Sequence, residues 1–313
     1  RSSAASDVYK RQMQESTNEA LRQLPVRLLI ADYTDSSKAK AMSLAMNATA
    51  DIPYDAVVIM DADNTAGTSF LSELNPVFQS GARAVQAHRT AKNTNTDIAV
   101  LDAASEEINN SIFRSGHIAL GLSSALIGSG MALEACWFRQ HIHLLETAGE
   151  DKEMEALLLK QRIHIEYLEH VYVKDEKTQK KEGIKNQRKR WIAAQFDSLV
   201  RTLPDFPKEL LRGNIDYCDK VFQWTLLPRI ILIFCTFFFT ILVTLVSPYS
   251  SIKWWILAFA LFLALFTAIP GHLLNKQLLR AIFQLPSLLL GIASNLFKLK
   301  GVNKKFIHTE HGN

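Results

Sequence analysis

The amino-acid sequence predicts an α/β domain followed by an α-helical membrane region. Short apolar strands alternate with helical segments up to about Asp219, and such alternation is typical of a mostly parallel sheet. The strongly apolar stretches all lie beyond that point. We therefore place the α/β domain at residues 13–215 and the membrane region at residues 216–313. Residues 1–12 are interpreted as a cloning or assembly scar, because they show no hydrophobic periodicity and no initiator methionine.

The α/β domain is expected to begin with a strand, a helix and a second strand. Residues 26–31 are a short apolar run, and residues 36–47 carry Ala41 and Leu44 at helical spacing after a serine cap. Residues 55–60 are rich in β-branched side chains, which suits a buried strand. Further along we expect helices at 68–78 and 151–162, strands at 83–88, 163–168 and 171–173, and a polar loop at 174–190.

Two apolar runs are long enough to cross a bilayer, and neither residues 230–246 of the first nor the second run contains a charged residue. Residues 226–246 and 254–274 each meet the requirement of about 20 residues, and two tryptophans open the second run. The tail after His272 is basic, whereas the connecting loop at 247–253 holds one basic residue. The positive-inside rule therefore predicts that the α/β domain and the tail are cytoplasmic. Residues 278–297 are apolar but interrupted, and we expect an interfacial or re-entrant helix there.

The composition argues against several other classes of protein. A net charge of +4 does not by itself indicate a nucleic-acid-binding surface, and no nucleic-acid partner is expected. The three cysteines show no paired spacing, so we expect neither a disulfide framework nor a zinc site.

Asp61 and Asp63 follow the predicted strand at 55–60 and form the first candidate site. Side chains at the carboxyl end of a strand can reach the crevice where α/β sheets bind ligands. Carboxylate oxygens suit Mg²⁺ or Mn²⁺, which often bridge to substrate phosphates. Acidic pairs also occur in solvated turns, so this pair alone does not identify a site.

Two further groups of residues could carry chemistry. Glu150 and Asp151 stand at the start of the next predicted helix, where a carboxylate can act as a general base or simply cap the helix. The QRKRW segment at 187–191 combines Arg190, which suits a diphosphate, with Trp191, which offers a flat face to a sugar ring. A solvated basic loop beside anionic lipid is the simpler interpretation of this segment.

The order of these motifs resembles the processive family-two glycosyltransferases, which include cellulose, chitin, hyaluronan and poly-N-acetylglucosamine synthases. DAD, ED at a helix start, QxxRW and then membrane spans follow one another in that family. QxxRW between ED and the spans is the specific match. Further similar segments are SSKAKAMSLAMN at 36–47, Gln86 with Arg89 and Asn93, Gly128-Ser129-Gly130-Met131, VYVKDE at 171–176 and FIHT at 306–309.

The resemblance implies a GT-A nucleotide-sugar-binding fold and inverting glycosyl transfer. The donor would be a nucleotide-sugar, with UDP-sugar expected, and the acceptor a growing polysaccharide or another glycan, at the cytoplasmic face of the cell membrane. Asp151, with Glu150 beside it, would supply the general base, and Asp61 and Asp63 would hold Mg²⁺ or Mn²⁺ on the donor diphosphate. The substrate-binding residues that the resemblance implies are Lys38, Gln86, Gly128, Ser129, Gly130, Gln187, Arg190 and Trp191.

The chain departs from the family pattern in two places. Ser37 stands where the family's GKxxALN segment has glycine. Nothing before residue 26 supplies the family's two opening strands, which carry an acidic residue for the nucleotide base. We therefore expect an N-terminally truncated gene product that lacks part of the nucleotide-binding half of the sheet, and this puts its activity in doubt.

Two other functions remain open from the sequence. VVIMDADNT at 57–65 also fits the opening motif of haloacid-dehalogenase-type phosphatases, in which Asp61 would be the nucleophile and Asp63 the acid/base. QRKRW and the spans would then have no explanation. A non-catalytic, membrane-anchored binding module would explain the spans and the basic segment, but not the ordered acidic motifs.

Overall fold

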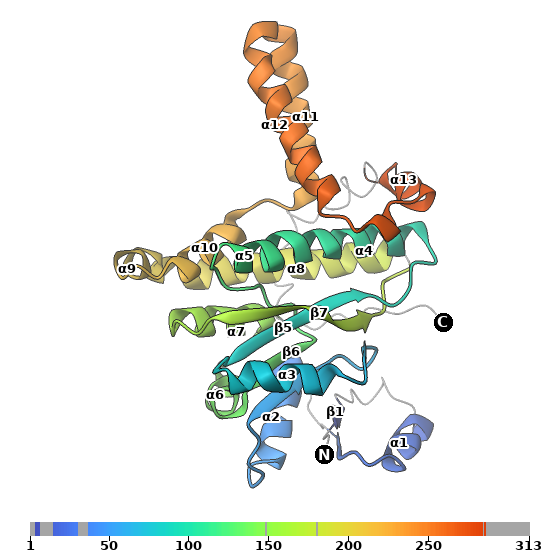
Figure 1. Cartoon of the computed structure of the whole chain (residues 1–313), viewed down its shortest axis with the longest axis vertical. Coiled ribbons are helices and arrows are strands. Elements are labelled where there is room, and N and C mark those ends of the chain that lie inside the picture. The colour runs from blue at the N-terminus through green and yellow to red at the C-terminus, as the bar shows by residue number, and fades with distance from the viewer. Residues whose placement is uncertain are drawn as a thin grey trace.

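A five-stranded mixed sheet lies at the centre of the computed structural model (Figure 1), in the order β3-β6-β5-β7-β4. Its strands are β3 (Ala56–Ile59), β4 (Thr65–Ala66), β5 (Ala84–Ala91), β6 (Met131–Glu134) and β7 (Ile165–Asp175). The structure describes residues 4–6, 15–30, 37–147, 149–179, 181–283 and 285, with backbone only at 4–6 and 181–186.

The direction of the strands differs from the mostly parallel sheet that the sequence predicts. β5 and β7 pair in parallel, but the pairs β3–β6, β5–β6 and β4–β7 are antiparallel. β3, β5 and β7 still share one direction, as strands connected by crossover helices do. β6 lies between β3 and β5 and runs antiparallel to both. The sequence did not reveal this, because hydrophobic alternation does not encode strand direction.

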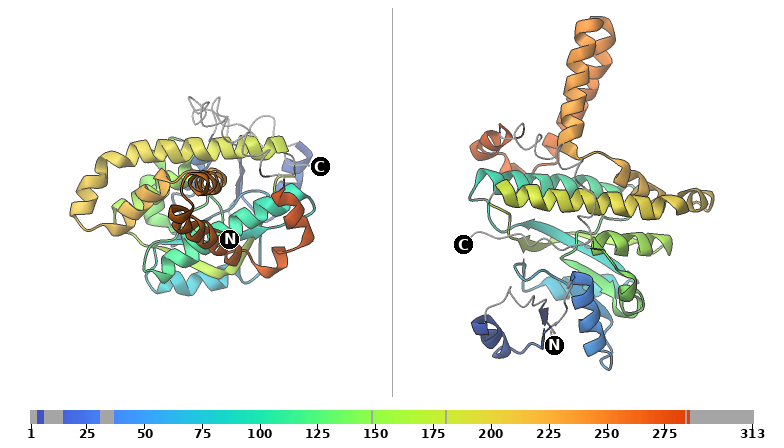
Figure 2. Two further views of the ribbon diagram at one scale, coloured as in Figure 1. Left: turned by 90° about the horizontal axis from the view of Figure 1, so that it is seen from above. Right: turned by 180° about the vertical axis from the view of Figure 1, so that it is seen from behind.

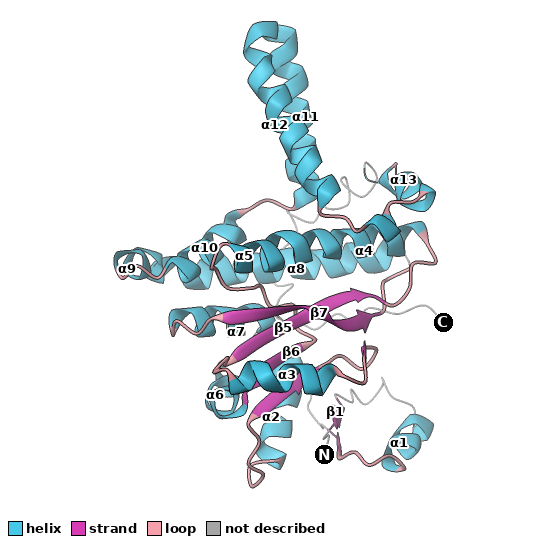
Figure 3. Cartoon of the chain, viewed as in Figure 1, coloured by secondary structure: helices cyan, strands magenta, loops and turns pink. Residues whose placement is uncertain are grey.

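Helices cover both faces of this sheet, and Figure 3 shows the strands as one layer between them. α3 (Phe70–Gln79) packs on one face of the sheet. Phe70 and Leu74 of this helix form an apolar cluster with Val85 of β5. Ala84, the neighbouring residue of β5, belongs to the main core on the other face, as strand alternation requires. The helices that contribute to this main core are α2 (Lys38–Ala48), α6 (Ala135–His141), α7 (Glu150–Lys160) and α10 (Ile215–Thr225).

The N-terminal part of the chain forms a separate two-stranded sheet. β2 (Leu28–Ile30) confirms the strand predicted at 26–31 and pairs in parallel with β1 (Ala4–Ser6). α1 (Glu15–Arg22) lies between these strands in the sequence. β1 falls within the segment that we set aside as a scar, so three of those residues pair with the chain that follows.

The region before the two long apolar helices is helical where we predicted a loop. The prediction of a polar loop at 174–190 is wrong for its second half, because α8 (Lys181–Thr202) carries the QRKRW segment. Lys, Arg, Gln and Glu are good helix formers, but α8 starts without an apolar periodicity that would reveal a helix. The predicted strands at 163–168 and 171–173 are both parts of β7, whose pairing with β5 shifts between Ala87 and His88.

α4 (Asp97–Asn110) is a largely buried helix between the sheet and the C-terminal helices. Thr96 caps it by accepting a hydrogen bond from the Ala99 backbone N–H at 3.1 Å. Its Val100 packs against Leu278 of α13 (Lys276–Ile282). Most of the interfacial helix predicted at 278–297 lies outside the described residues.

Two apolar helices form a hairpin that projects away from the sheet (Figures 1 and 2). α11 (Arg229–Val246) and α12 (Pro248–Thr267) are long and apolar enough to cross a membrane, with mean hydropathies of 2.5 and 1.7. Only 11% of each is buried, which favours membrane association over a soluble core helix. The second apolar helix starts and ends earlier than the span predicted at 254–274. Residues 248–253, predicted as loop, are therefore helical.

Candidate active site

The DAD segment forms a tight turn after β3. Asn64 closes the turn, because its backbone N–H donates to the Asp61 carbonyl at 3.0 Å and its side-chain Oδ1 accepts from the Asp61 N–H at 3.2 Å. Asp61 and Asp63 therefore lie beyond the carboxyl end of β3, as the sequence predicts. The Asp61 side chain keeps 39% of its surface exposed, so a ligand can reach it.

Lys38, at the first residue of α2, connects this turn with two other predicted motifs. Its Nζ donates to Asp61 Oδ1 and to the Gly128 carbonyl, the latter at 2.7 Å, and lies 3.9 Å from Glu150 Oε1. Burial lowers the pKa of Lys38, but the charges of Asp61 and Glu150 outweigh this effect and raise it overall. Lys38 is therefore a permanent cation at the centre of the cluster.

Glu150 and Asp151 occupy the first turn of α7, next to Gly128. Glu150 is 8% exposed. Burial raises its pKa to about 7, helped by the negative charges of Asp151 and Asp61, although the positive charge of Lys38 lowers it. A Cβ on Gly128 would lie 3.8 Å from the Asp151 Cβ, so the loop backbone is close to this carboxylate. The two adjacent acids thus face the same loop.

The loop before β6 is shaped by Gln86 of β5. The Gln86 side chain is fully buried, with Nε2 donating to the carbonyls of Ser129 (3.0 Å) and Gly130 (3.2 Å) and Oε1 accepting from the Ile127 N–H (3.1 Å). Gly130 has a φ of +65°, and a Cβ there would lie 3.1 Å from Val173 Cγ2. Gln86 and Gly130 therefore fix the loop from behind, and its Gly128 end faces the acids.

The loop is also held from the side of α7 and α10. Glu155 of α7 accepts a hydrogen bond from the Leu126 N–H at 3.1 Å and pairs with Lys220 of α10 at 2.9 Å. Both charged side chains are 3% exposed. α10 is thus part of the support of the site as well as the helix that precedes the hairpin.

The QRKRW residues approach the cluster from α8. Burial lowers the pKa of Arg190, and the charges of Glu150 and Asp61 act on it in the opposite direction, so Arg190 lies near both carboxyl groups. Gln187 Oε1 is buried and has no hydrogen-bond partner among the described residues. Trp191, which follows Arg190 along the helix, has 42% of its surface exposed. Helix α8, rather than a loop, therefore carries these three predicted residues.

The donor set beside the turn suits a divalent cation that is completed by a substrate. Within the described ranges, no three His, Cys, Asp or Glu side chains converge on a metal position. Mg²⁺ is commonly held by one or two carboxylates together with substrate phosphates, so a full protein cage is not required. Asp63 Oδ1 and Asp175 Oδ1 lie 3.2 and 3.3 Å from the same atom, Asn64 Nδ2. Carboxylates gathered beside the exposed Asp61 fit such an ion.

Sequence reasoning missed the residues behind the turn. Asp175 ends β7 and pairs with Lys177, and Lys177 also pairs with Glu106 of α4. These residues were interpreted as a solvated charged segment or were not considered. The available signal was VYVKDE at 171–176, whose similarity to the family pattern included Asp175.

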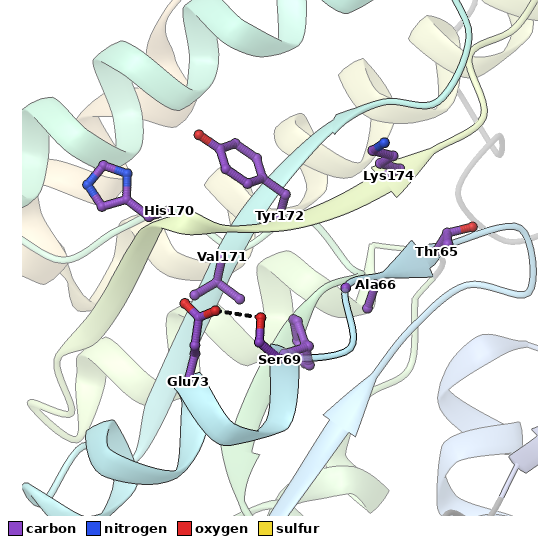
Figure 4. A pocket seen from close by; sticks show the side chains of 10 residues that line it. Thr65, Ala66, Ser69, Glu73, His170, Val171, Tyr172 and Lys174 are labelled. Carbon is purple, nitrogen blue, oxygen red and sulfur yellow. Dashed lines mark hydrogen bonds between the residues drawn. The ribbon is translucent and has the colours of Figure 1, made fainter.

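A cavity of about 260 Å³ lies apart from this cluster, at the edge formed by β4, β7 and α3 (Figure 4). Ser69 and Glu73 of α3 line it and share a hydrogen bond of 2.7 Å. Tyr172 and Lys174 of β7 also contribute to the lining. None of the predicted site residues is among the residues that line this cavity.

Comparison with known proteins identifies a family for most of the chain. Residues 56–267, more than half of the chain, match the family model described as glycosyl transferase family group 2. No curated protein matches the sequence. A solved structure titled "Crystal Structure of a Mycobacterial Protein" is similar at 12% identity and a TM-score of 0.40. The similarity covers 63% of this chain and 62% of that one.

The matched region contains the DAD turn, the ED pair of α7, the QRKRW segment of α8 and both apolar helices. A haloacid-dehalogenase-type phosphatase or a non-catalytic anchor would not account for this match. The chain therefore belongs to the glycosyl transferase family group 2.

Proposed function

We propose that this enzyme transfers a sugar, with inversion, from a nucleotide-sugar to a glycan acceptor at the cytoplasmic face of a membrane, as the processive members of the family do. The expected donor is a UDP-sugar, and the acceptor is a growing polysaccharide or another glycan. The observation that supports the proposal most is the convergence on Lys38, which joins Asp61, Gly128 and Glu150. The DAD, GSG and ED motifs meet there from distant parts of the sequence.

The residues have separate roles in this mechanism. Asp151 takes the proton of the acceptor hydroxyl while that oxygen bonds to the anomeric carbon, and the bond from this carbon to the diphosphate breaks with its electron pair. Arg190 binds the diphosphate through its guanidinium group. Asp63 and Asp61 would hold Mg²⁺ or Mn²⁺, which would neutralise the charge that develops on the leaving diphosphate. Gln187 and Trp191 complete the donor and acceptor side.

The position of the site relative to the hairpin is consistent with a membrane enzyme. Tyr217 and Val221 of α10 belong to the main core, and α11 begins at Arg229, a few residues after α10 ends. The domain is therefore fixed close to the apolar helices. Together with the basic tail after His272, this supports a cytoplasmic catalytic domain on a multi-pass anchor.

Two substitutions test the roles. Asp151→Asn should reduce sugar transfer by about 10²–10⁴-fold, because the proton of the acceptor has no base, while UDP binding in the presence of Mn²⁺ stays near wild type. Asp63→Asn should weaken UDP binding and abolish its dependence on Mn²⁺, because the cation holds the diphosphate. Incorporation of radiolabelled sugar and UDP binding with and without Mn²⁺ measure the two effects.

Asp51→Asn is the matched control, since Asp51 is an exposed aspartate outside the cluster. It should change neither property. Near-normal transfer by Asp151→Asn would mean that Asp151 only caps α7, and the assignment of the base would be wrong.

A further inference from the structure

Asn64 uses its whole side-chain amide to connect three parts of the site. Its Oδ1 accepts from the Asp61 backbone N–H at 3.2 Å, and its Nδ2 lies 3.2 Å from Asp63 Oδ1 and 3.3 Å from Asp175 Oδ1. A carboxamide has one acceptor oxygen and two N–H donors, so these contacts occupy both ends of the group. A turn alone would need only the contact with Asp61. The two carboxylate contacts require a further explanation.

Asp175, the second carboxylate, is itself fixed by buried cations. Its Oδ2 lies 2.9 Å from Lys177 Nζ and 3.7 Å from Arg89 Nε. Lys177 is 3% exposed and also binds Glu106 of α4. Arg89 donates to the other oxygen of Glu106 at 2.6 Å. Asp175 is therefore held by two cations that both also bind Glu106 of α4.

The ion pairs in this cluster are buried, and they shift the pKa of Glu106. Burial raises the pKa of Glu106, but Arg89 and Lys177 outweigh that effect and lower it to about 2. A buried ion pair that loses one partner leaves an uncompensated charge, which is strongly destabilising. The Arg89–Glu106–Asp175–Lys177 cluster is thus a rigid support.

We propose that Asn64 is a positioning residue that orients the Asp63 carboxylate toward the cation by tying it to Asp175 and the buried cluster. The inference rests on the proposed function, because it takes Asp63 as a ligand of the cation. A hydrogen bond from a neutral amide to a ligating carboxylate is the outer-shell support that metal sites use, and its removal typically costs about 10–100-fold in metal affinity.

The experiment uses Asn64→Ser in the purified full chain. A serine hydroxyl can still accept a hydrogen bond within the turn, but it cannot reach Asp63 and Asp175 together. The measured quantity is the dissociation constant of Mn²⁺, followed by the EPR signal of the free ion at saturating UDP. We expect this constant to rise about 10–100-fold. The matched control is Asn95→Ser, since Asn95 is an exposed asparagine whose amide bonds Gln179 at 3.2 Å, and it should bind Mn²⁺ as wild type does.

Each outcome bears on the inference. Unchanged Mn²⁺ affinity in Asn64→Ser, with normal binding by wild type, overturns the role of Asn64 and leaves the proposed function intact. Equal losses in both serine variants overturn it as well. Absence of UDP-dependent Mn²⁺ binding in wild type overturns both the inference and the proposed metal site. If Asn64→Ser does not fold, Asn64→Gln replaces it. Its longer amide cannot keep all three contacts, so wild-type affinity in that variant also contradicts the inference.

Discussion

At the scale of single residues, the neighbouring acids Glu150 and Asp151 have different environments. Glu150 is buried beside Lys38, and its pKa is raised to about 7. The Asp151 side chain keeps 19% of its surface exposed at the edge of the cluster. Two adjacent carboxyl groups in unlike surroundings suit different tasks. The more accessible Asp151 is the better candidate to meet an acceptor hydroxyl.

The raised pKa of Glu150 predicts how stability varies with pH. The protonated form is favoured by the fold, so its contribution is complete below the unfolded pKa of about 4.3 and is lost as the pH rises through about 7. Glu150→Gln should remove this dependence, which is on the order of a few kcal/mol at 1.36 kcal/mol per pKa unit. Thermal unfolding between pH 5 and 8 measures it. Parallel pH profiles for the variant and wild type would contradict the prediction.

Short motifs predicted several of the residues that lie near one another in the candidate site. Lys38 and Gly128 came from family resemblance, and in the structure Lys38 binds both Asp61 and the Gly128 carbonyl. Asn64 and Lys177 were not predicted as site residues. Two of their contacts join distant positions: Lys177 and Glu106 are 71 residues apart, and Asn64 and Asp175 are 111 residues apart. A local pattern cannot show such pairs, and a buried lysine is rare enough that a charged segment is normally interpreted as solvated.

At the scale of secondary-structure elements, α7 and α8 approach each other very closely at the ED motif. Gly149 precedes α7, and a Cβ at this position would lie 2.7 Å from the Ala194 Cβ of α8. Real Cβ atoms do not come this close, so a side chain at Gly149 would force the two helices apart. We therefore expect this contact to govern how closely Asp151 of α7 approaches Arg190 of α8.

Gly149→Ala should therefore reduce sugar transfer by about 10²-fold, the effect of a displacement of about 1 Å in a catalytic group. Combining it with Ala194→Gly removes the colliding methyl group and should restore most of the activity. Ala194→Gly alone, the matched control, should lower stability by about 1 kcal/mol and leave transfer near wild type. Transfer assays on the three variants test this, and an unrescued double variant would show that the close approach is not what matters.

Elements with a clear hydrophobic pattern were predicted correctly, and the others were not. β3, α2 and α7 lie where the sequence places them. α8 was missed at its start because its first turns are polar, and the order of the sheet was missed because β6 is inserted against the direction of β3 and β5. Strand order depends on contacts between strands, so the sequence of a single strand does not determine it.

At the scale of the whole molecule, the hairpin α11–α12 and the domain lie at opposite ends of the long axis (Figure 1). The turn at Ser247 is the far end of the hairpin, and Ser250 is exposed beside it. Cys136 is exposed on the domain. The proposed topology therefore puts Ser250 outside the cell and Cys136 inside it.

Cysteine labelling in intact cells tests this topology. Ser250→Cys in a Cys136→Ser background should react with a membrane-impermeant maleimide added from outside. The native Cys136 should react only after the cells are permeabilised, because the membrane separates it from the reagent. The reverse pattern would rule out a cytoplasmic catalytic domain.

The pairing of Lys220 with Glu155 also decides where the chain can be divided. A cut at residue 215, where hydropathy suggests that the soluble part ends, would remove Lys220 and leave Glu155 as a buried charge without its counter-ion. The main core would also lose Tyr217 and Val221. The unpaired charge alone costs about 3–5 kcal/mol, comparable to the stability of many whole domains. A shortened version that keeps the main core therefore has to extend at least through Thr225, the last residue of α10.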